Sequence, residues 1–194
     1  MRRTGILAML VCALALACVE ARATTAVQIS MEEQVATARA ICRGRVSKIE
    51  SRFVEGRIFY DASQLEKALD AFQTAIAEID KTGAPPLADL HYYAGDTLVR
   101  LERPAEAEYH LQQELRAFPQ QVRARGVLAA LYQETGRTGE AGEVLETLLR
   151  LSPTPEAYSL AARLWTSFGS PSQASAVRAE AARASTGRRT APAQ

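Results

Sequence analysis

A repeat with a period of about 34 residues is the feature that most constrains how this chain can fold. Residues of similar size recur at that interval, and a single shift aligns four pairs: Gly95 with Ala129, Ala107 with Ala141, Leu111 with Leu145, and Pro119 with Pro153. One unit of this length cannot cover its own apolar face, so such units stack and share a core. The period therefore predicts an array of similar supersecondary units.

Each repeated segment is expected to hold two helices joined by a turn. In residues 122–153 the turn is predicted around Gly136, because glycine ends helices at low cost. In residues 88–119 Pro104 suits the first turn of the second helix. Pro119 and Pro153 close the two segments, since proline cannot occupy a helix interior. No segment alternates β-branched and polar residues for long, so no strand is expected.

The two segments resemble tetratricopeptide repeats, which are helix–turn–helix units of about 34 residues with a small residue in each helix where neighbours approach closely. The aligned glycine and alanine residues match those small positions. His91 and Arg125 depart from the pattern, because the family often has Trp or another large apolar residue there. The resemblance implies an all-α fold, a right-handed α-solenoid of stacked helix pairs.

Two further units extend the array. The segment 155–185 has a turn at Gly169, with Ser170 and Pro171 suited to the start of the next helix. The segment 49–82 is a weaker match and is followed by an inserted loop rich in Gly and Pro. The repeats are therefore expected at about residues 49–82, 88–119, 122–153 and 155–185. Residues 186–194 lack periodicity and are predicted to form a disordered tail.

Residues 24–48 are expected to form a helical extension before the first repeat. Ser30 and Glu33 have the spacing of a capping box, which favours a helix start. Apolar residues then follow at intervals of three and four, as in an amphipathic helix. Residues 30–60 form either one long helix or two helices broken near Gly44, and the long helix is favoured.

The first 23 residues have the pattern of a signal peptide. Arg2 and Arg3 precede an uncharged apolar run, Ile6–Val19, and Ala21-Arg22-Ala23 predicts cleavage before Thr24. The run is shorter than the roughly 20 residues that span a bilayer as a helix. The chain is therefore expected to be exported to the periplasm or cell envelope. Alternatively, Ala15-Leu16-Ala17-Cys18 resembles a lipobox, and lipidation of Cys18 would tether the protein to a membrane.

The charge balance and the single cysteine after the signal peptide exclude several classes. The chain has 23 basic and 22 acidic residues, so it has no global field to attract nucleic acid. Cys42 alone follows residue 23, which leaves no intramolecular disulfide. His91 is expected at a packing position and His110 on an exposed helix face, too few ligands for a metal site. No cofactor motif and no catalytic constellation is found, so an enzyme is not expected.

The resemblance implies a concave groove, lined by the first helix of each repeat, that holds an extended peptide or a partner helix. Tyrosine and arginine are the residue types that often dominate interface energetics. The alternative is that the tyrosines pack between helices and the charges are only solvated. The family's carboxylate clamp of Lys, Asn and Arg is not expected, because tyrosine and aspartate stand at matching places. The candidate groove residues are Tyr92, Tyr93, Asp96, Arg100, Arg123, Val127, Ala130, Gln133, Glu156, Leu160 and Arg163.

The sequence thus predicts an exported scaffold that binds a protein or peptide segment, within a cell-envelope assembly. A structural module that self-associates into a homo-oligomer through its N-terminal helix is the alternative. An enzymatic function is the least favoured of the three.

Overall fold

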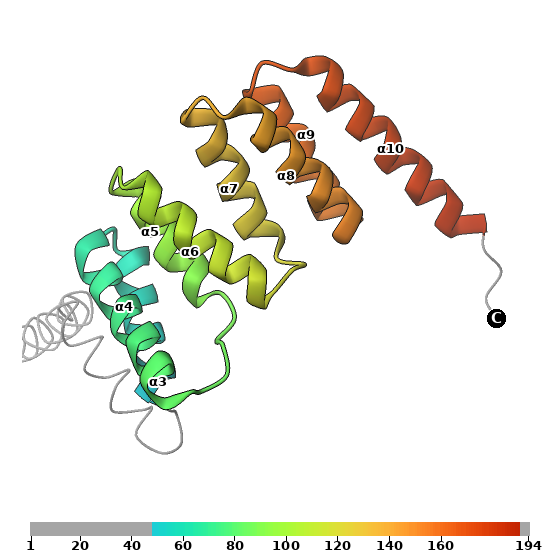
Figure 1. The fold of residues 1–194 in the computed structure, drawn as a ribbon. Helices are drawn as coiled ribbons and strands as arrows, with labels where there is room; N and C mark the ends of the chain where they lie inside the picture. The colour runs from blue at the N-terminus through green and yellow to red at the C-terminus, as the bar shows by residue number, and fades with distance from the viewer. Residues whose placement is uncertain (1–47, 191–194) are drawn as a thin grey trace, which may run out of the picture. The chain divides into compact units, whose positions relative to one another are not determined.

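The computed structural model describes residues 48–190, with side chains to residue 186. This part of the chain consists of helices joined by turns and loops and contains no strand (Figure 1), so the expected all-α fold is confirmed. The signal peptide, Cys18, the extension 24–47 and the choice between one helix and two lie outside the described residues. The helices are α3 (Lys48–Asp61), α4 (Leu65–Thr82), α5 (Leu90–Arg100), α6 (Pro104–Ala117), α7 (Val122–Glu134), α8 (Thr138–Leu151), α9 (Pro155–Ser167) and α10 (Pro171–Thr190).

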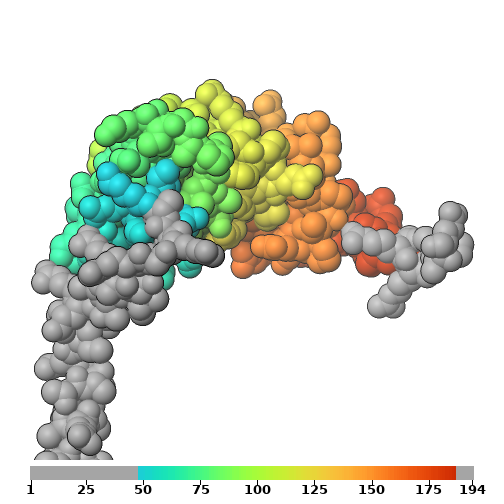
Figure 2. Space-filling model, turned by 90° about the horizontal axis from the view of Figure 1, so that it is seen from below, coloured from blue at the N-terminus to red at the C-terminus, as the bar shows by residue number. Residues whose placement is uncertain are grey.

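The described helices form consecutive pairs, and each pair is one repeat. α5 contacts both α3 and α4, α7 contacts both α5 and α6, and α9 contacts both α7 and α8. The first helices of the pairs thus contact one another in turn, whereas the second helices of successive pairs contact one another weakly at most. Figure 2 shows the repeats following each other in sequence order. The described part is a solenoid, and we call the side formed by α3, α5, α7 and α9 the first-helix face.

A residue with positive φ marks the same position in the turn of each described pair. These residues are Ser63 (φ 58°), Glu102 (φ 57°), Gly136 (φ 78°) and Gly169 (φ 72°). The last two are glycines, which adopt the left-handed region without a steric penalty, whereas Ser63 and Glu102 adopt it at a cost. The turn geometry is therefore a property of the repeat and not of glycine alone.

Small residues allow the two helices of each pair to approach closely. A Cβ built on Gly95 would lie 2.8 Å from Cγ of Leu111, and one on Gly56 would lie 2.5 Å from Cε1 of Phe72. Ala107, Ala129 and Ala141 are fully buried. The large residues beside them, Leu111 and Leu145, are also fully buried. The close contacts that the repeat period predicted are present.

The interior of the second repeat contains polar groups that the sequence did not predict. His110 is buried, and its Nδ1 lies 2.9 Å from Nδ1 of His91. Burial lowers the pKa of both imidazoles, to about 4 for His110. The expectation that His110 lies on an exposed face is wrong, because the second helix turns this ring toward α5. In the part of the chain that the structure describes, no three His, Cys, Asp or Glu groups gather where they could hold a metal.

The C-terminal helix is longer than the sequence predicted. α10 continues to Thr190, so the expected disordered tail from Thr186 is wrong for residues 186–190. Extending an existing helix by one residue costs little compared with starting one, so a loss of apolar periodicity does not end it. Among the described helices, none is both long enough and apolar enough to cross a bilayer.

Candidate functional site

Aromatic and charged side chains from three successive first helices meet on the first-helix face. We call this set the tyrosine–arginine cluster. It comes from the end of α3, the whole of α5 and the start of α7, so it spans three repeats. Its members are Arg57, Tyr60, Asp89, Tyr92, Tyr93, Asp96, Arg100 and Arg123.

Tyr93 forms the base of the cluster. Its side chain is buried, and its ring stacks on Phe72, with centroids 5.9 Å apart. Tyr60 meets it edge-on at 5.2 Å, and Tyr92 does so at 5.1 Å. Edge-to-face pairs of this kind add about 1 kcal/mol to the burial of the rings. Tyr93 is therefore mainly a packing residue, as the alternative from the sequence held, while Tyr60 and Tyr92 stay partly exposed.

Three arginines lie over the faces of these rings. The guanidinium carbon of Arg57 is 5.0 Å from the Tyr93 centroid, that of Arg100 is 4.7 Å from Tyr60, and that of Arg123 is 4.8 Å from Tyr92. A guanidinium over a ring gains a cation–π attraction and can still donate N–H hydrogen bonds to a carboxylate. The side chains of Arg100 and Arg123 remain 47% and 44% exposed. The rings thus hold the cations in place without covering them.

Two carboxylates complete the cluster. Asp96 accepts a hydrogen bond from the hydroxyl of Tyr60 and lies 3.9 Å from Nε of Arg100. Asp89 lies 2.9 Å from Nη2 of Arg123. Burial, together with the Asp96 carboxylate, raises the pKa of the Tyr60 hydroxyl, so it stays protonated and remains a donor. Three guanidinium groups therefore face two carboxylates, which leaves one positive charge in excess.

A buried carboxylate from α6 fixes the start of α5, which carries half of the cluster. Glu114 accepts hydrogen bonds from the backbone N–H of Asp89 at 2.8 Å and of Tyr92 at 3.2 Å. The first N–H groups of a helix have no partner within the helix, and a carboxylate satisfies them. Burial raises the pKa of the Glu114 carboxyl, although these N–H groups stabilise its charged form. Glu114 therefore acts on the cluster through the position of α5.

The structure brings together only part of the predicted groove set. Tyr92, Tyr93, Asp96, Arg100 and Arg123 all belong to the tyrosine–arginine cluster. The others do not: Val127 packs against the core, Gln133 and Ala130 are half-buried on α7, Glu156 is exposed at the start of α9, Leu160 packs on Gly126, and Arg163 lines a separate pocket on α9.

Sequence reasoning missed Arg57, Tyr60 and Asp89. The repeat itself carries the signal for each of them. Asp89 lies one repeat period before the candidate Arg123. Tyr60 has the position in the first repeat that Val99 has in the second and Gln133 has in the third. The inserted loop lengthens the interval between the first repeat and the second, and the same longer step leads from Asp96 back to Arg57. These three residues could have been found by aligning each candidate position with the preceding repeat and allowing for the length of the inserted loop.

The fold and this site define a class: a helical-repeat scaffold for protein interactions, with first helices that present a shared face. Two models of the tetratricopeptide repeat match the chain, one over residues 53–122 and the other over residues 98–164. The chain belongs to the tetratricopeptide repeat family. The expectation drawn from the repeat period is therefore confirmed.

One curated relative is human protein O-mannosyl-transferase TMTC2, which is 27% identical over 99 residues. That match covers 51% of this chain and 12% of the relative. The chain thus spans about an eighth of the length of the curated relative that it matches, so the transferase activity in that name is not carried over to it.

Solved structures with the same fold include MamA, with a TM-score of 0.61 and 14% identity, covering 83% of this chain and 92% of that one. A TPR protein from Thermus thermophilus has a TM-score of 0.61 and 19% identity, covering 78% of this chain and 81% of the other. YrrB, described as a TPR protein with an unusual peptide-binding site, has a TM-score of 0.55 and 20% identity, covering 78% and 76%. At these identities the similarity establishes the fold alone.

Proposed function

We propose that this chain binds an extended, acidic segment of another protein across the tyrosine–arginine cluster. The observation that supports this most directly is the set of three arginines whose guanidinium groups lie over tyrosine rings. Ordering a flexible side chain before the partner arrives lowers the cost of binding, because about 0.5–1.5 kcal/mol per immobilised side chain is not lost again. A binding function also agrees with the family, whose members act as interaction scaffolds.

The charge of the cluster favours a partner with carboxylates. Asp89 and Asp96 already contact Arg123 and Arg100, whereas Arg57 contacts the ring of Tyr93 and is paired with no carboxylate among residues 48–186. A partner carboxylate would meet one guanidinium that is paired with no carboxylate of the described residues and two arginine side chains that are about half exposed. Bidentate Arg–carboxylate pairs add geometric specificity to this attraction.

The test uses a library of random peptides displayed on phage and selected on the purified chain. We expect the enriched peptides to be acidic and to lose at least tenfold in affinity for the double variant Arg100→Glu/Arg123→Glu. The matched control is Arg116→Glu/Arg150→Glu, which changes two exposed arginines on second helices and should leave affinity within twofold. Enriched peptides without acidic residues, or equal loss in both variants, would reject the proposal.

We further propose that binding takes place outside the cytoplasm, in a cell-envelope assembly. The support is the sequence of residues 1–23, with two arginines, an apolar run and an Ala-x-Ala site. Mass spectrometry of the protein purified from cells measures the mature N-terminus. A chain that begins at Thr24 supports export as a free protein, whereas a chain that begins with an acylated Cys18 supports a membrane tether. An intact residue 1 in the cytoplasmic fraction would contradict both.

A further inference from the structure

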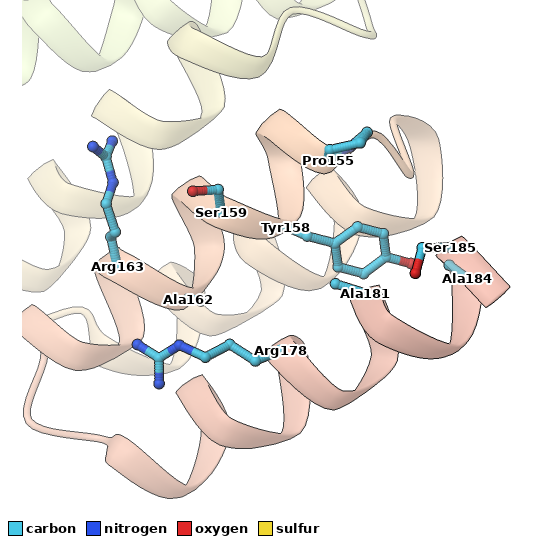
Figure 3. Close-up of a pocket in the computed structure, with 9 residues that line it drawn as sticks. All are labelled: Pro155, Tyr158, Ser159, Ala162, Arg163, Arg178, Ala181, Ala184 and Ser185. Atoms are coloured by element: carbon cyan, nitrogen blue, oxygen red, sulfur yellow. The ribbon is translucent and has the colours of Figure 1, made fainter.

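A pocket of about 550 Å³ lies between α9 and α10, in the last described helix pair (Figure 3). Its floor is made by Tyr158, Ala162, Ala181 and Ala184, and its rim carries two arginines, Arg163 on α9 and Arg178 on α10. We call it the terminal pocket. It is separate from the tyrosine–arginine cluster, because neither helix contributes to that cluster.

In each upstream helix pair, the surface equivalent to the terminal pocket is covered by the first helix of the next pair. Phe72, Leu111 and Leu145 occupy one position of the second helices, and each is fully buried. The equivalent residue in the last pair, counted from the positive-φ residue in the turn of each pair, is Arg178, which is exposed. Among the described helices α10 is the last, so in this part of the chain no further first helix packs on the terminal pocket.

The residues in the terminal pocket show that its occupant differs from a repeat helix. Arg178 stands in the last repeat where the third repeat has Leu145, and Ala181 stands where the third repeat has Leu148. The second helix of the last pair therefore presents a cation and a small alanine in place of two bulky apolar side chains. An apolar helix placed there would bury a guanidinium without a partner, which is costly. The occupant therefore needs an anionic group close to the arginines and bulky apolar groups over the alanines.

The two arginines have unused capacity for such a group. Nη2 of Arg178 donates a hydrogen bond to Oγ1 of Thr166 at 3.2 Å, and the structure pairs neither arginine with a carboxylate in the part that it describes. Glu180 is engaged at the other end, where it accepts a hydrogen bond from the Tyr158 hydroxyl at 3.1 Å. Figure 3 shows both arginines toward the end of the pocket away from the Tyr158 ring. The terminal pocket is thus cationic at one end and apolar along its length.

We propose that the terminal pocket binds an amphipathic helix of a partner protein, with apolar side chains on the alanine floor and carboxylates at the end that meets Arg163 and Arg178. The lining of the terminal pocket runs from Pro155 to Arg163 along α9, about 12 Å at the rise of an α-helix, which accommodates about two turns of a partner helix. Docking of a helix into an apolar groove is a common recognition mode. The chain's own residues 24–47 are a poorer match, since Arg39, Arg43 and Arg45 outnumber Glu32 and Glu33 and give the segment a positive net charge.

The test measures fluorescence anisotropy with a synthetic amphipathic helix of about five turns, leucine-faced and with two glutamates in its last turn. A second peptide with lysines in place of the glutamates serves as the comparison. We expect the acidic peptide to bind at least tenfold more tightly than the basic one. The variant Arg163→Glu/Arg178→Glu should abolish this preference, and Ala184→Trp, which fills the floor, should weaken the binding of the acidic peptide at least tenfold.

Arg150→Glu/Arg183→Glu is the matched control and should leave affinity within twofold, as should Arg100→Glu/Arg123→Glu in the other site. Circular dichroism checks that every variant keeps its helix content. Equal binding of the two peptides, no binding at about 1 mM peptide, or loss in the control variants would overturn the proposal. Sedimentation that shows a dimer broken by Arg178→Glu would also overturn it, because a second copy would then occupy the terminal pocket.

Discussion

The second and third repeats share one backbone plan but fill it differently. At three equivalent positions the repeat 88–119 has Thr97, His110 and Glu114, whereas the repeat 122–153 has Leu131, Val144 and Leu148. Thr97 and Glu114 are fully buried and so is Leu148. At these three positions the second repeat therefore has polar side chains, two of which donate or accept hydrogen bonds of defined direction at α5, and the third repeat has apolar ones.

This difference separates two tasks. Burial of leucine stabilises the stack without fixing the rotation of a helix, because apolar contact is not directional. Hydrogen bonds from the start of α5 to Glu114 fix that helix, and α5 carries Tyr92, Asp96 and Arg100. We infer that the polar interior positions the tyrosine–arginine cluster, while the apolar interior contributes most of the stability. The predictions that follow compare the two repeats.

The largest effect is expected from the apolar repeat. Leu148→Ala should lower the free energy of unfolding by about 3 kcal/mol, because it removes buried methyl groups and leaves a cavity. Urea denaturation followed by circular dichroism measures the change. Arg150→Ala, on the same helix but exposed, should change it by less than about 0.5 kcal/mol. A similar small effect for both variants would mean that Leu148 is not part of the core.

The histidine pair should make stability depend on pH. The pKa of His110 in the folded chain, about 4, lies below its ordinary value of 6.5, so the unfolded chain takes up protons first as pH falls. The contribution of His110 to the free energy of unfolding is fully present well above pH 6.5, and acidification to pH 4 should lower that free energy by about 3 kcal/mol. Asp80, near His91, and Glu106, near His110, reduce the shifts by favouring the charged rings.

The variant His110→Val, which uses the residue type of the third repeat, isolates this effect. Its urea midpoint should change less between pH 6.5 and pH 4 than that of the natural chain. If the urea midpoints of the two proteins changed equally with pH, the loss of stability on acidification would come from groups other than His110.

A smaller loss is expected from Glu114→Gln. The amide keeps one acceptor oxygen and loses the charge, so one of the two N–H groups at the start of α5 is left without its partner. We expect a loss of about 1.5 kcal/mol, and a weaker binding of the selected acidic peptides through the altered position of α5. Arg116→Gln, exposed on the same helix, is the control. Unchanged peptide affinity in Glu114→Gln would separate the polar interior from the cluster.

The smallest effect is a gain. Glu102→Gly places glycine where the second repeat has a left-handed glutamate and the third already has Gly136. We expect a stabilisation of about 1 kcal/mol, the strain released being larger than the added freedom of the unfolded chain. Gly136→Ala should have the opposite sign. A loss in Glu102→Gly would show that the glutamate side chain contributes more than its backbone conformation costs.

The fold could be predicted from the sequence because it depends on side-chain size at fixed intervals. Ala107, Ala141 and the residues aligned with them record where helices touch, and this information survives without coordinates. The turn at Glu102 was also predictable, although it lacks glycine, because Pro104 follows it. Helix ends were less predictable, and α10 passes the point where apolar periodicity stops.

The candidate site was predicted in part, because its residues lie on the same face but interact across repeats. Periodicity places Tyr92 and Asp96 on the first helix, yet it cannot tell that Tyr60 reaches Asp96 or that Arg100 lies over Tyr60. The buried polar groups were missed for a related reason. A glutamate or histidine on a second helix is usually solvated. Its burial becomes apparent only from its partners in the folded chain, which are backbone N–H groups for the glutamate and a second imidazole ring for the histidine.

The loop between α4 and α5 lengthens the chain without disturbing the stack. It holds the extra residues that widen the interval between the first two repeats, yet Ser63 and Glu102 keep the same turn geometry on either side. Its exposed Pro85 and Pro86 make it a suitable site for a genetic insertion. An epitope tag or fluorophore between Ala84 and Pro85 would report on the protein in living cells while leaving both proposed binding sites uncovered.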